Sequence, residues 1–518
     1  MKPISSSTQM KAGAILSYVQ IFLSVLTGLL YTPVMLRLMG QNEYGLYGTV
    51  NSTIALLSLL DLGFTSSYIR FYSRYKIENR QDKINSFNSL FFIVFLVISV
   101  IAALIGFFLS FNPVLIFDDG LTSEELSKAK VMMILLTVSM ILGFMSTVFN
   151  CYISANQKFI FSKSLNVFST IVNVGVNLIV LFCGYGAVGL ITVSLVLSII
   201  TKIITIVYAY KTLHFEFDFG HIEKSLFKSV LTFSGLIAIN MIVDKVNSGI
   251  DNILLGRFCG TAVVAVYSVG ATLKSHFQTF STAISGVFTP HIHNLVNSYE
   301  MDSKEQRNVL TELFVKVGRT QYLLLALIAS GVVFFGKPFI NIWAGEGYEE
   351  SYVIALILII PSIVPLIQNV GIEIQRAENR HYYRAYIYGS MAILNLIISI
   401  FLCQVWEGIG AALGTGFATL FANGLIMNIV YHKKINIDMI TFWKNILRQT
   451  VGMILPFICG TLIMVFVDMN SILKLLVWII VYILIYCVCV WFLSMNNYEK
   501  KLILGFLMKF SKAINRKR

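Results

Sequence analysis

Long apolar runs separated by short polar segments make up most of the chain from near its start to about residue 494. Most runs reach the roughly 20 residues that an α-helix needs to cross the hydrocarbon core of a bilayer. Alternating strand-length segments, which would favour a barrel, are absent. We therefore predict an all-α integral membrane protein with about 14 transmembrane helices, at about 12–36, 44–68, 85–110, 129–155, 160–183, 187–210, 226–255, 261–288, 317–336, 350–375, 384–405, 408–431, 447–467 and 472–494.

Two neighbouring runs carry polar side chains at helical spacing. Within 226–255 one helical face carries polar residues at i, i+4, i+7 and i+11, which are Asn240, Asp244, Asn247 and Asp251. Lys245 lies next to Asp244 in the sequence. In 261–288 a second face holds Tyr267, Lys274, Gln278, Ser281 and Ser285. Ionisable groups at membrane depth usually face a bundle interior or a water-filled cavity. The pattern predicts a hydrated lumen.

The first half repeats this polar lining. Gln20 lies on a polar face of the first helix, together with Ser17, Ser24, Thr27 and Tyr31. In the second helix Asp61 has two interpretations. It is either a proton- or cation-responsive group in the lumen, or a structural partner for Arg70, Arg74 or a neighbouring helix, and the structural interpretation is somewhat favoured.

Composition agrees with the membrane class. Hydrophobic residues form 57% of the 518 residues and charged residues 13%, against roughly a quarter charged in soluble domains. The seven cysteines contain no CxxC pair, so we interpret them as packing residues and predict neither a disulfide framework nor a metal site. Without a P-loop or a large outer loop for catalytic groups, we predict no enzyme activity and no cofactor.

Basic residues predict the orientation. With the N-terminus in the cytoplasm, 30 of the 39 Lys and Arg residues fall in inner segments and six in outer loops. Because short cytoplasmic loops are enriched in Lys and Arg, both termini are expected in the cytoplasm. The first run is too long for a signal-peptide core and is expected to be a retained anchor. This topology explains the net charge of +13 without a nucleic-acid partner.

The chain also repeats itself. Arg37-x-x-Gly40 followed by Tyr47 matches Arg257-x-x-Gly260 followed by Tyr267 at a constant offset of 220 residues. Six helices in each half give a parallel repeat, typical of transporters that alternate access by rocking one half on the other. We predict an N-terminal six-helix lobe, a C-terminal six-helix lobe, and a region with two accessory helices and a basic tail, at 1–218, 219–436 and 437–518.

These motifs resemble a known family. Gly40-x4-Gly45-Leu46-Tyr47, Leu59-Leu60-Asp61-Leu62-Gly63-Phe64 and Arg70-Phe71 are similar to the start of Wzx-type polysaccharide flippases, which belong to the multidrug/oligosaccharidyl-lipid/polysaccharide exporter superfamily. Asp251-Asn252-Ile253-Leu254-Leu255-Gly256 and Ala265-Val266-Tyr267-Ser268-Val269 are similar to the opening of the second half. The resemblance covers about 1–432.

The resemblance implies a flippase of the bacterial cytoplasmic membrane, which moves a polyprenyl-diphosphate-linked oligosaccharide to the outer leaflet during O-antigen or capsule synthesis. Such a substrate needs cations for its diphosphate, polar groups for its sugars and an opening for its lipid tail. The expected cations are Lys245, Lys274, Arg37 and Arg257, and the expected sugar-facing groups are Asn240, Asn247, Gln278 and Gln20. The candidates for ion coupling are Asp244, Asp251 and Asp61. Glycosyltransferases and a polysaccharide polymerase are the expected protein partners.

Two other transport functions fit the same residues. A cation-coupled drug antiporter of this superfamily would also have two six-helix lobes and embedded acids. A flippase for a peptidoglycan-precursor lipid is closer still to the function that the resemblance implies. The two extra C-terminal helices and the basic lumen residues favour a lipid-linked substrate.

Overall fold

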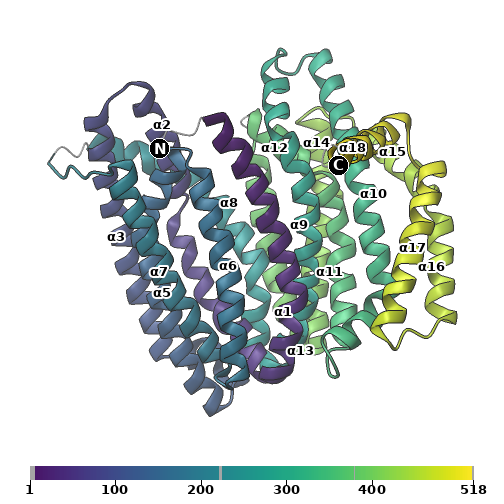
Figure 1. The fold of residues 1–518 in the computed structure, drawn as a ribbon, viewed down its shortest axis with the longest axis horizontal. Helices are drawn as coiled ribbons and strands as arrows, with labels where there is room; N and C mark the ends of the chain where they lie inside the picture. Colours follow the sequence, from purple (N-terminus) through teal and green to yellow (C-terminus); the bar gives the residue numbers. More distant parts are fainter. Residues whose placement is uncertain (1–5, 221–223, 379, 516–518) are drawn as a thin grey trace. The chain divides into compact units, whose positions relative to one another are not determined.

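The computed structural model describes residues 6–220, 224–378 and 380–515, and within these ranges all regular elements are helices (Figure 1). The first half contains α1 (Ser6–Leu56), η1 (Leu57–Asp61), α2 (Phe64–Ile77), α3 (Gln81–Phe111), α4 (Val114–Phe117), η2 (Asp118–Gly120), α5 (Ser123–Ala155), α6 (Phe159–Phe182) and α7 (Gly186–Leu213). The next elements are α8 (Lys224–Phe258), α9 (Thr261–Asn297), α10 (Lys304–Trp343), α11 (Glu350–Ile367), α12 (Asn369–Ala377) and α13 (Tyr382–Thr419). The chain ends with η3 (Leu420–Ile426), α14 (Met427–Lys433), α15 (Met439–Val451), α16 (Ile454–Phe466), α17 (Ile472–Leu493) and α18 (Asn497–Asn515).

The all-helical membrane fold that the apolar runs predict is confirmed. Nine helices in the described residues are long and apolar enough to cross a membrane, or ten if α15 and α16 form one bent span. Two of the nine each contain two predicted spans, because Thr8–Ile77 is interrupted at Gly40 and Tyr382–Lys433 at Trp406 and Glu407. The number fourteen remains a prediction.

The two glycines of the repeated motif share an unusual backbone conformation. Gly40 has φ 76° and Gly260 has φ 88°, a left-handed region that favours glycine. Each lies where one predicted span gives way to the next. The matching conformations agree with the predicted internal repeat.

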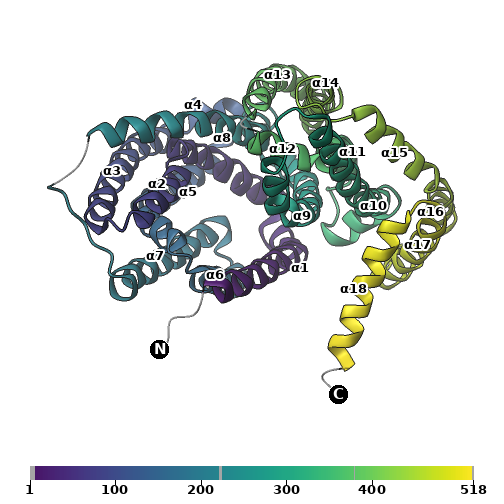
Figure 2. The same ribbon diagram turned by 90° about the horizontal axis from the view of Figure 1, so that it is seen from above.

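The described chain forms two compact units. Unit 1 comprises residues 1–268 and 395–411, and unit 2 comprises residues 269–394 and 412–518. In unit 1, α5 packs against both α3 and α7, and α1 packs against α6 and α8 (Figure 2). In unit 2, α10 packs against α11, α15 and α17. The predicted lobe boundaries at 218 and 436 remain predictions.

Each unit has its own core. In unit 1 an aromatic cluster joins α2, α3 and α5, with ring centroids of Tyr68 and Phe91 5.1 Å apart and those of Phe87 and Phe91 4.6 Å apart. In unit 2, Phe314 and Phe442 pack edge to face at 4.9 Å. These aromatic pairs hold the helices together from inside.

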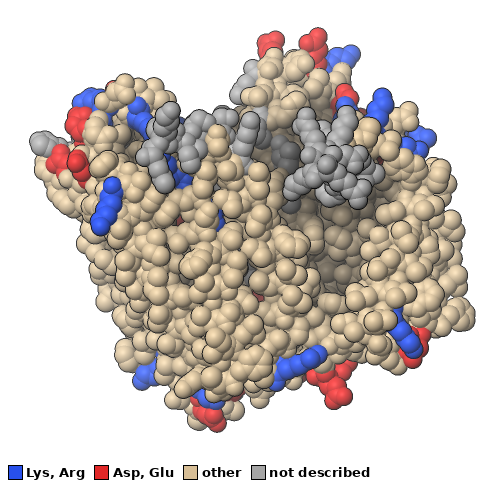
Figure 3. Space-filling view, viewed as in Figure 1, with Lys and Arg blue, Asp and Glu red and all other residues tan. Residues whose placement is uncertain are grey.

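The outer faces of the helices are apolar. Phe182 and Phe492 are each 73% exposed, as expected of side chains that face lipid. On the face drawn in Figure 3, charged side chains gather near the helix ends, and few appear in the band between them. This distribution fits a protein whose middle band lies in hydrocarbon.

Candidate functional site

A polar cluster lies where α1, α8 and the start of α9 meet inside unit 1. Asn252 donates from Nδ2 to Ser52 Oγ at 3.0 Å, and Ser268 Oγ donates to Asn252 Oδ1 at 3.4 Å. One residue earlier on each helix, Tyr267 donates its hydroxyl proton to the buried carboxylate of Asp251. Ser52 lies twelve residues beyond Gly40, or about 18 Å along the helix. Ser52 therefore lies within the predicted membrane span 44–68.

Glycines let these helices approach closely. A Cβ added to Gly45 would lie 1.7 Å from the backbone oxygen of Thr261, and one added to Gly256 would lie 2.5 Å from Thr49 Cγ2. Backbone atoms cannot move aside as a flexible side chain can, so Gly45 is required for this packing. The Gly40-x4-Gly45 motif thus positions α1 against α8 and α9, and brings the polar cluster together.

Asp251 is the predicted site residue whose contact is clearest. It is 5% exposed and holds Tyr267, which the sequence places on the neighbouring polar face. A hydrogen-bonded partner stabilises a buried carboxylate, so this pair has a structural role. Coupling by Asp251 remains a prediction.

Asp61 accepts hydrogen bonds from within its own segment. Its Oδ1 accepts from Thr65 Oγ1 at 3.0 Å and from Thr65 N at 3.4 Å. The helix breaks beside it, where Leu62 and Gly63 adopt left-handed conformations with φ 47° and 76°. Asp61 therefore stabilises the start of α2 through Thr65, which is not among the partners that the structural interpretation named, and its role in ion coupling remains a prediction.

Arg257 is engaged at the C-terminal end of α8. Its Nη2 lies 3.2 Å from Asp118 Oδ2 in a half-exposed ion pair, and its Nη1 donates to the carbonyl of Leu115 at 3.2 Å. An ion pair with Asp118 reduces the positive charge that Arg257 offers to a substrate. Its assignment as a diphosphate ligand remains a prediction.

The other predicted ligands divide between the two units. Arg37 is exposed on α1, Gln20 is half-buried on α1, and Lys245 is half-buried on α8, all in unit 1. Lys274 is half-buried and Gln278 is exposed, and both lie on the part of α9 that belongs to unit 2. The side chains of Asn240, Asp244 and Asn247 lie outside the described residues. A shared cavity lined by these groups remains a prediction.

The polar face of α9 also packs against other helices in unit 2. Ser281 is fully buried, donates to the carbonyl of Leu366 at 3.1 Å, and accepts from Gln321 Nε2 at 3.0 Å. Asn369 also donates to Ser281 Oγ, at 3.3 Å. These contacts join α9 to α10, α11 and α12, so this end of the predicted lumen face packs against protein.

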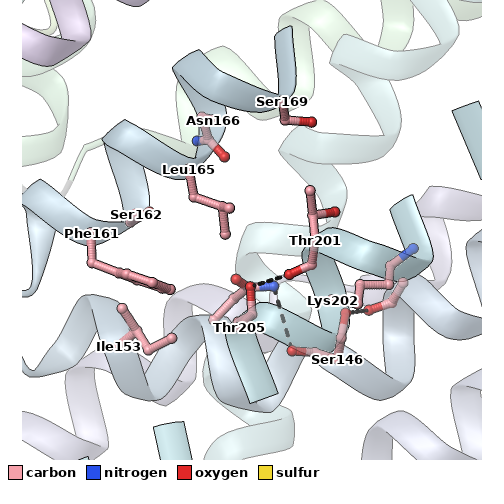
Figure 4. A pocket seen from close by; sticks show the side chains of 12 residues that line it. Ser146, Ile153, Phe161, Ser162, Leu165, Asn166, Ser169, Thr201, Lys202 and Thr205 are labelled. Atoms are coloured by element: carbon pink, nitrogen blue, oxygen red, sulfur yellow. Dashed lines mark hydrogen bonds between the residues drawn. The ribbon is translucent and has the colours of Figure 1, made fainter. Parts of the chain in front are cut away.

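A polar pocket inside unit 1 was missed by sequence reasoning. It has a volume of about 250 Å³ and is bounded by α5, α6 and α7 (Figure 4). Its wall consists of Gly143, Ser146, Asn150, Ile153, Phe161, Ser162, Leu165, Asn166, Ser169, Thr201, Lys202 and Thr205. The available signal was Lys202, a lysine within an apolar run.

Lys202 is held between two helices. Its Nζ donates to the carbonyl of Ser139 on α5 at 3.1 Å and to the hydroxyl of Ser198 on α7. Within the described residues it has no carboxylate partner. Both partners lie outside the wall of the pocket, so these two hydrogen bonds hold the ammonium group of Lys202 between α5 and α7.

This combination of long apolar helices with polar groups buried between them defines a polytopic membrane protein. The sequence pattern of the polysaccharide biosynthesis protein family matches residues 10–296, which is more than half of the chain. The chain belongs to this family. No curated protein sequence matches it.

Solved structures share the fold at low sequence identity. The lipid II flippase MurJ, in an inward closed conformation, has a TM-score of 0.72 and 15% identity, covering 96% of this chain and 99% of the other. The Vibrio cholerae MATE transporter VcmN, in its bent form, has a TM-score of 0.54 and 13% identity, covering 84% and 99%. The eukaryotic MATE transporter AtDTX14 has a TM-score of 0.56 and 13% identity, covering 82% and 95%. The chain therefore shares its all-helical fold with these membrane proteins.

Proposed function

We propose that this protein flips a polyprenyl-diphosphate-linked oligosaccharide from the cytoplasmic to the outer leaflet of the bacterial cytoplasmic membrane. The observation that carries the proposal is the family match over residues 10–296, because it links the chain to polysaccharide biosynthesis. The structures compared above, which share its fold, are a lipid flippase and two MATE transporters. The Wzx-type assignment, which the opening motifs suggest, is the most specific form of this proposal.

The comparison of solved structures favours a lipid-linked substrate over a drug. The lipid II flippase structure covers 96% of the chain with a TM-score of 0.72, whereas the two MATE transporters cover 82–84% with TM-scores of 0.54 and 0.56. The uncovered share in the MATE comparisons is about the size of the predicted accessory region 437–518. A peptidoglycan-precursor lipid is therefore the second candidate substrate, and a cation-coupled drug antiporter the third.

Charge and hydrogen bonding assign roles to the predicted ligands. Lys245 and Lys274 would bind the diphosphate, because a lysine is a point charge that attracts phosphate without the fixed fork of an arginine. Gln20 and Gln278, with Asn240 and Asn247, would hydrogen-bond the sugars. Alternating access would then expose these groups first to the cytoplasm and later to the outer side.

The proposal is tested by flipping in proteoliposomes. A lipid-linked oligosaccharide with a fluorescent sugar is incorporated, and a membrane-impermeant quencher reports the fraction on each leaflet over time. We expect Lys245→Ala and Lys274→Ala each to slow flipping about tenfold, the effect of losing one charge-assisted contact. The exposed Lys474→Ala is the matched control and should flip at the wild-type rate.

Different substrates and variants separate the alternatives. Faster flipping of a labelled peptidoglycan precursor than of the oligosaccharide would favour the second candidate. Wild-type flipping in both lysine variants would remove them from the diphosphate site.

Proton coupling by Asp244 is a separate part of the proposal. If Asp244→Asn abolishes transport driven by an imposed pH gradient but preserves exchange, Asp244 carries the coupling proton. If Asp244 instead only pairs with Lys245, Asp244→Asn should lose all transport, and Asp244→Asn with Lys245→Gln should regain it.

A further inference from the structure

A basic pocket lies at the end of α2 and at the turn between α5 and α6, within unit 1. Its volume is about 490 Å³. The wall carries two cations, three amide side chains and a hydroxyl, and consists of Gln9, Ser73, Lys76, Ile77, Ala155, Asn156, Gln157 and Lys158. By the predicted orientation this turn faces the cytoplasm.

In the part of the chain that the structure describes, no carboxylate balances the two lysines of this pocket. Lys76 Nζ donates to Asn156 Oδ1 at 2.7 Å, and Asn156 is fixed in turn because its Nδ2 donates to Tyr72 OH at 2.7 Å. Among the described residues, neither Lys76 nor Lys158 forms an ion pair with a carboxylate. Like charges in one pocket repel, and an anion between them would relieve this cost.

The start of α6 adds backbone donors to the pocket. Lys158 occupies the N-cap position of this 24-residue helix, and its own side chain makes no capping hydrogen bond. Gln9 Oε1 accepts a hydrogen bond from one amide of the first turn, Ile160 N, at 3.1 Å. A cation at a helix N-terminus opposes the helix dipole, whereas a phosphate there is stabilised by the dipole and by the free amides.

The internal repeat supplies a contrasting turn. Ala155-Asn156-Gln157-Lys158 resembles Ala377-Glu378-Asn379-Arg380 in the second half. There Arg380 is neutralised, since its Nη2 lies 2.6 Å from Asp302 Oδ2 and its Nη1 lies 3.5 Å from Glu378 Oε2. In the first half, Asn156 stands in place of Glu378, and Lys76 adds a second lysine beside Lys158. The first turn has the charge balance of an anion site, and the second does not.

We propose that Lys76 and Lys158 form a docking site for the phosphate group of an anionic lipid in the cytoplasmic leaflet. Ile77, which is 83% exposed beside the pocket, would contact the lipid chain near the membrane surface. Basic pockets on the cytoplasmic side of membrane proteins bind such head groups. The inference uses the predicted orientation, and it concerns binding at the surface of unit 1 rather than the transport step.

The test measures lipid retention by the purified full chain. Native mass spectrometry compares the retention of phosphatidylglycerol with that of phosphatidylcholine, each added in the same neutral detergent. We expect wild type to retain the anionic lipid preferentially, and Lys76→Gln with Lys158→Gln to retain it about tenfold less. Lys211→Gln, which removes an exposed lysine from the end of α7, is the matched control and should behave as wild type.

Each alternative outcome has a distinct signature. Equal retention in the double variant, or an equal loss in Lys211→Gln, would overturn the site. Displacement of the lipid by millimolar inorganic diphosphate would assign the pocket to a free anion instead. Lys158→Gln alone should keep the wild-type melting temperature, because Lys158 has no side-chain hydrogen bond in the described structure; a clear decrease would show a structural role. Flipping is not measured here, so failure of this site leaves the proposed function intact.

Discussion

Two acidic residues of unit 2, Glu378 and Asp302, have pKa values that are shifted by burial and by contact with Arg380. The side chain of Glu378 is 1% exposed and lies 3.5 Å from Arg380, which binds Asp302 more closely at 2.6 Å. Burial raises the pKa of Glu378 from its usual 4.5 to about 7, although the charge of Arg380 opposes this rise. The pKa of Asp302 is lowered, because Arg380 donates hydrogen bonds to it.

We predict that the stability of the protein decreases as pH rises from about 5 to about 7. A raised pKa means that the folded state holds its proton more tightly than the unfolded state, so the stabilisation is complete below 4.5 and is lost as pH rises through about 7. The effect is at most about 3 kcal/mol. Thermal unfolding in detergent at a series of pH values measures it.

Glu378→Gln provides the control. The neutral amide should remove this dependence, so that the variant is as stable as wild type at pH 5 and more stable above pH 7. An identical pH profile in wild type and variant would show that Glu378 does not titrate in this range.

At the scale of elements, one buried ion pair attaches the C-terminal helix to α10. Arg319 Nε lies 2.7 Å from Glu499 Oε1, and the two side chains are 6% and 2% exposed. Arg319 also donates to the carbonyls of Asn445 at 3.1 Å and Ser494 at 3.0 Å. Glu499 lies in the first turn of α18, so this pair fixes where that helix begins.

We predict that Arg319→Met destabilises the protein by about 3–5 kcal/mol, because it leaves the Glu499 carboxylate buried without its cation. Adding Glu499→Leu should recover most of this loss. Melting temperature measures the stability, and limited proteolysis of the basic tail measures the attachment of α18.

An exposed pair serves as the comparison. Arg376 pairs with Glu373 at 2.7 Å, but its side chain is 57% exposed. Arg376→Met should therefore cost less than about 1 kcal/mol. Equal losses in the Arg319 and Arg376 variants would contradict the importance of burial.

At the scale of the whole molecule, the predicted topology is open to direct measurement. We expect a membrane-impermeant thiol reagent added to intact cells to label Glu346→Cys, in a predicted outer loop, and not Arg80→Cys or Lys434→Cys, in predicted inner loops. The reason is the concentration of Lys and Arg in the inner segments.

The labelling needs a clean background. Cys183 is exposed in the turn between α6 and α7, so the test starts from Cys183→Ala. Permeabilised cells, in which all three positions should react, are the control. Labelling of Arg80→Cys in intact cells would show that the orientation is the reverse of the predicted one. The basic pocket would then lie on the outer side.

The sequence by itself determined the class of fold and the position of its turns. Apolar runs of membrane-spanning length become helices because every backbone polar group must be satisfied inside hydrocarbon, which leaves the chain few other conformations. The repeated Arg-x-x-Gly motif correctly marked Gly40 and Gly260, since only a left-handed backbone links consecutive spans there. The family resemblance rested on the same local features.

Only the tertiary structure decided which polar residues meet. Helical spacing places residues on a common face but does not state which neighbour that face contacts. Thus Asp251 meets Tyr267, whereas Ser281 on the predicted lumen face of α9 is buried against Gln321. Arg257 pairs with Asp118 from a segment 139 residues away. The polar pocket around Lys202 likewise needs three helices to pack together. Such long-range contacts depend on side-chain packing between helices, which no local pattern in one segment contains.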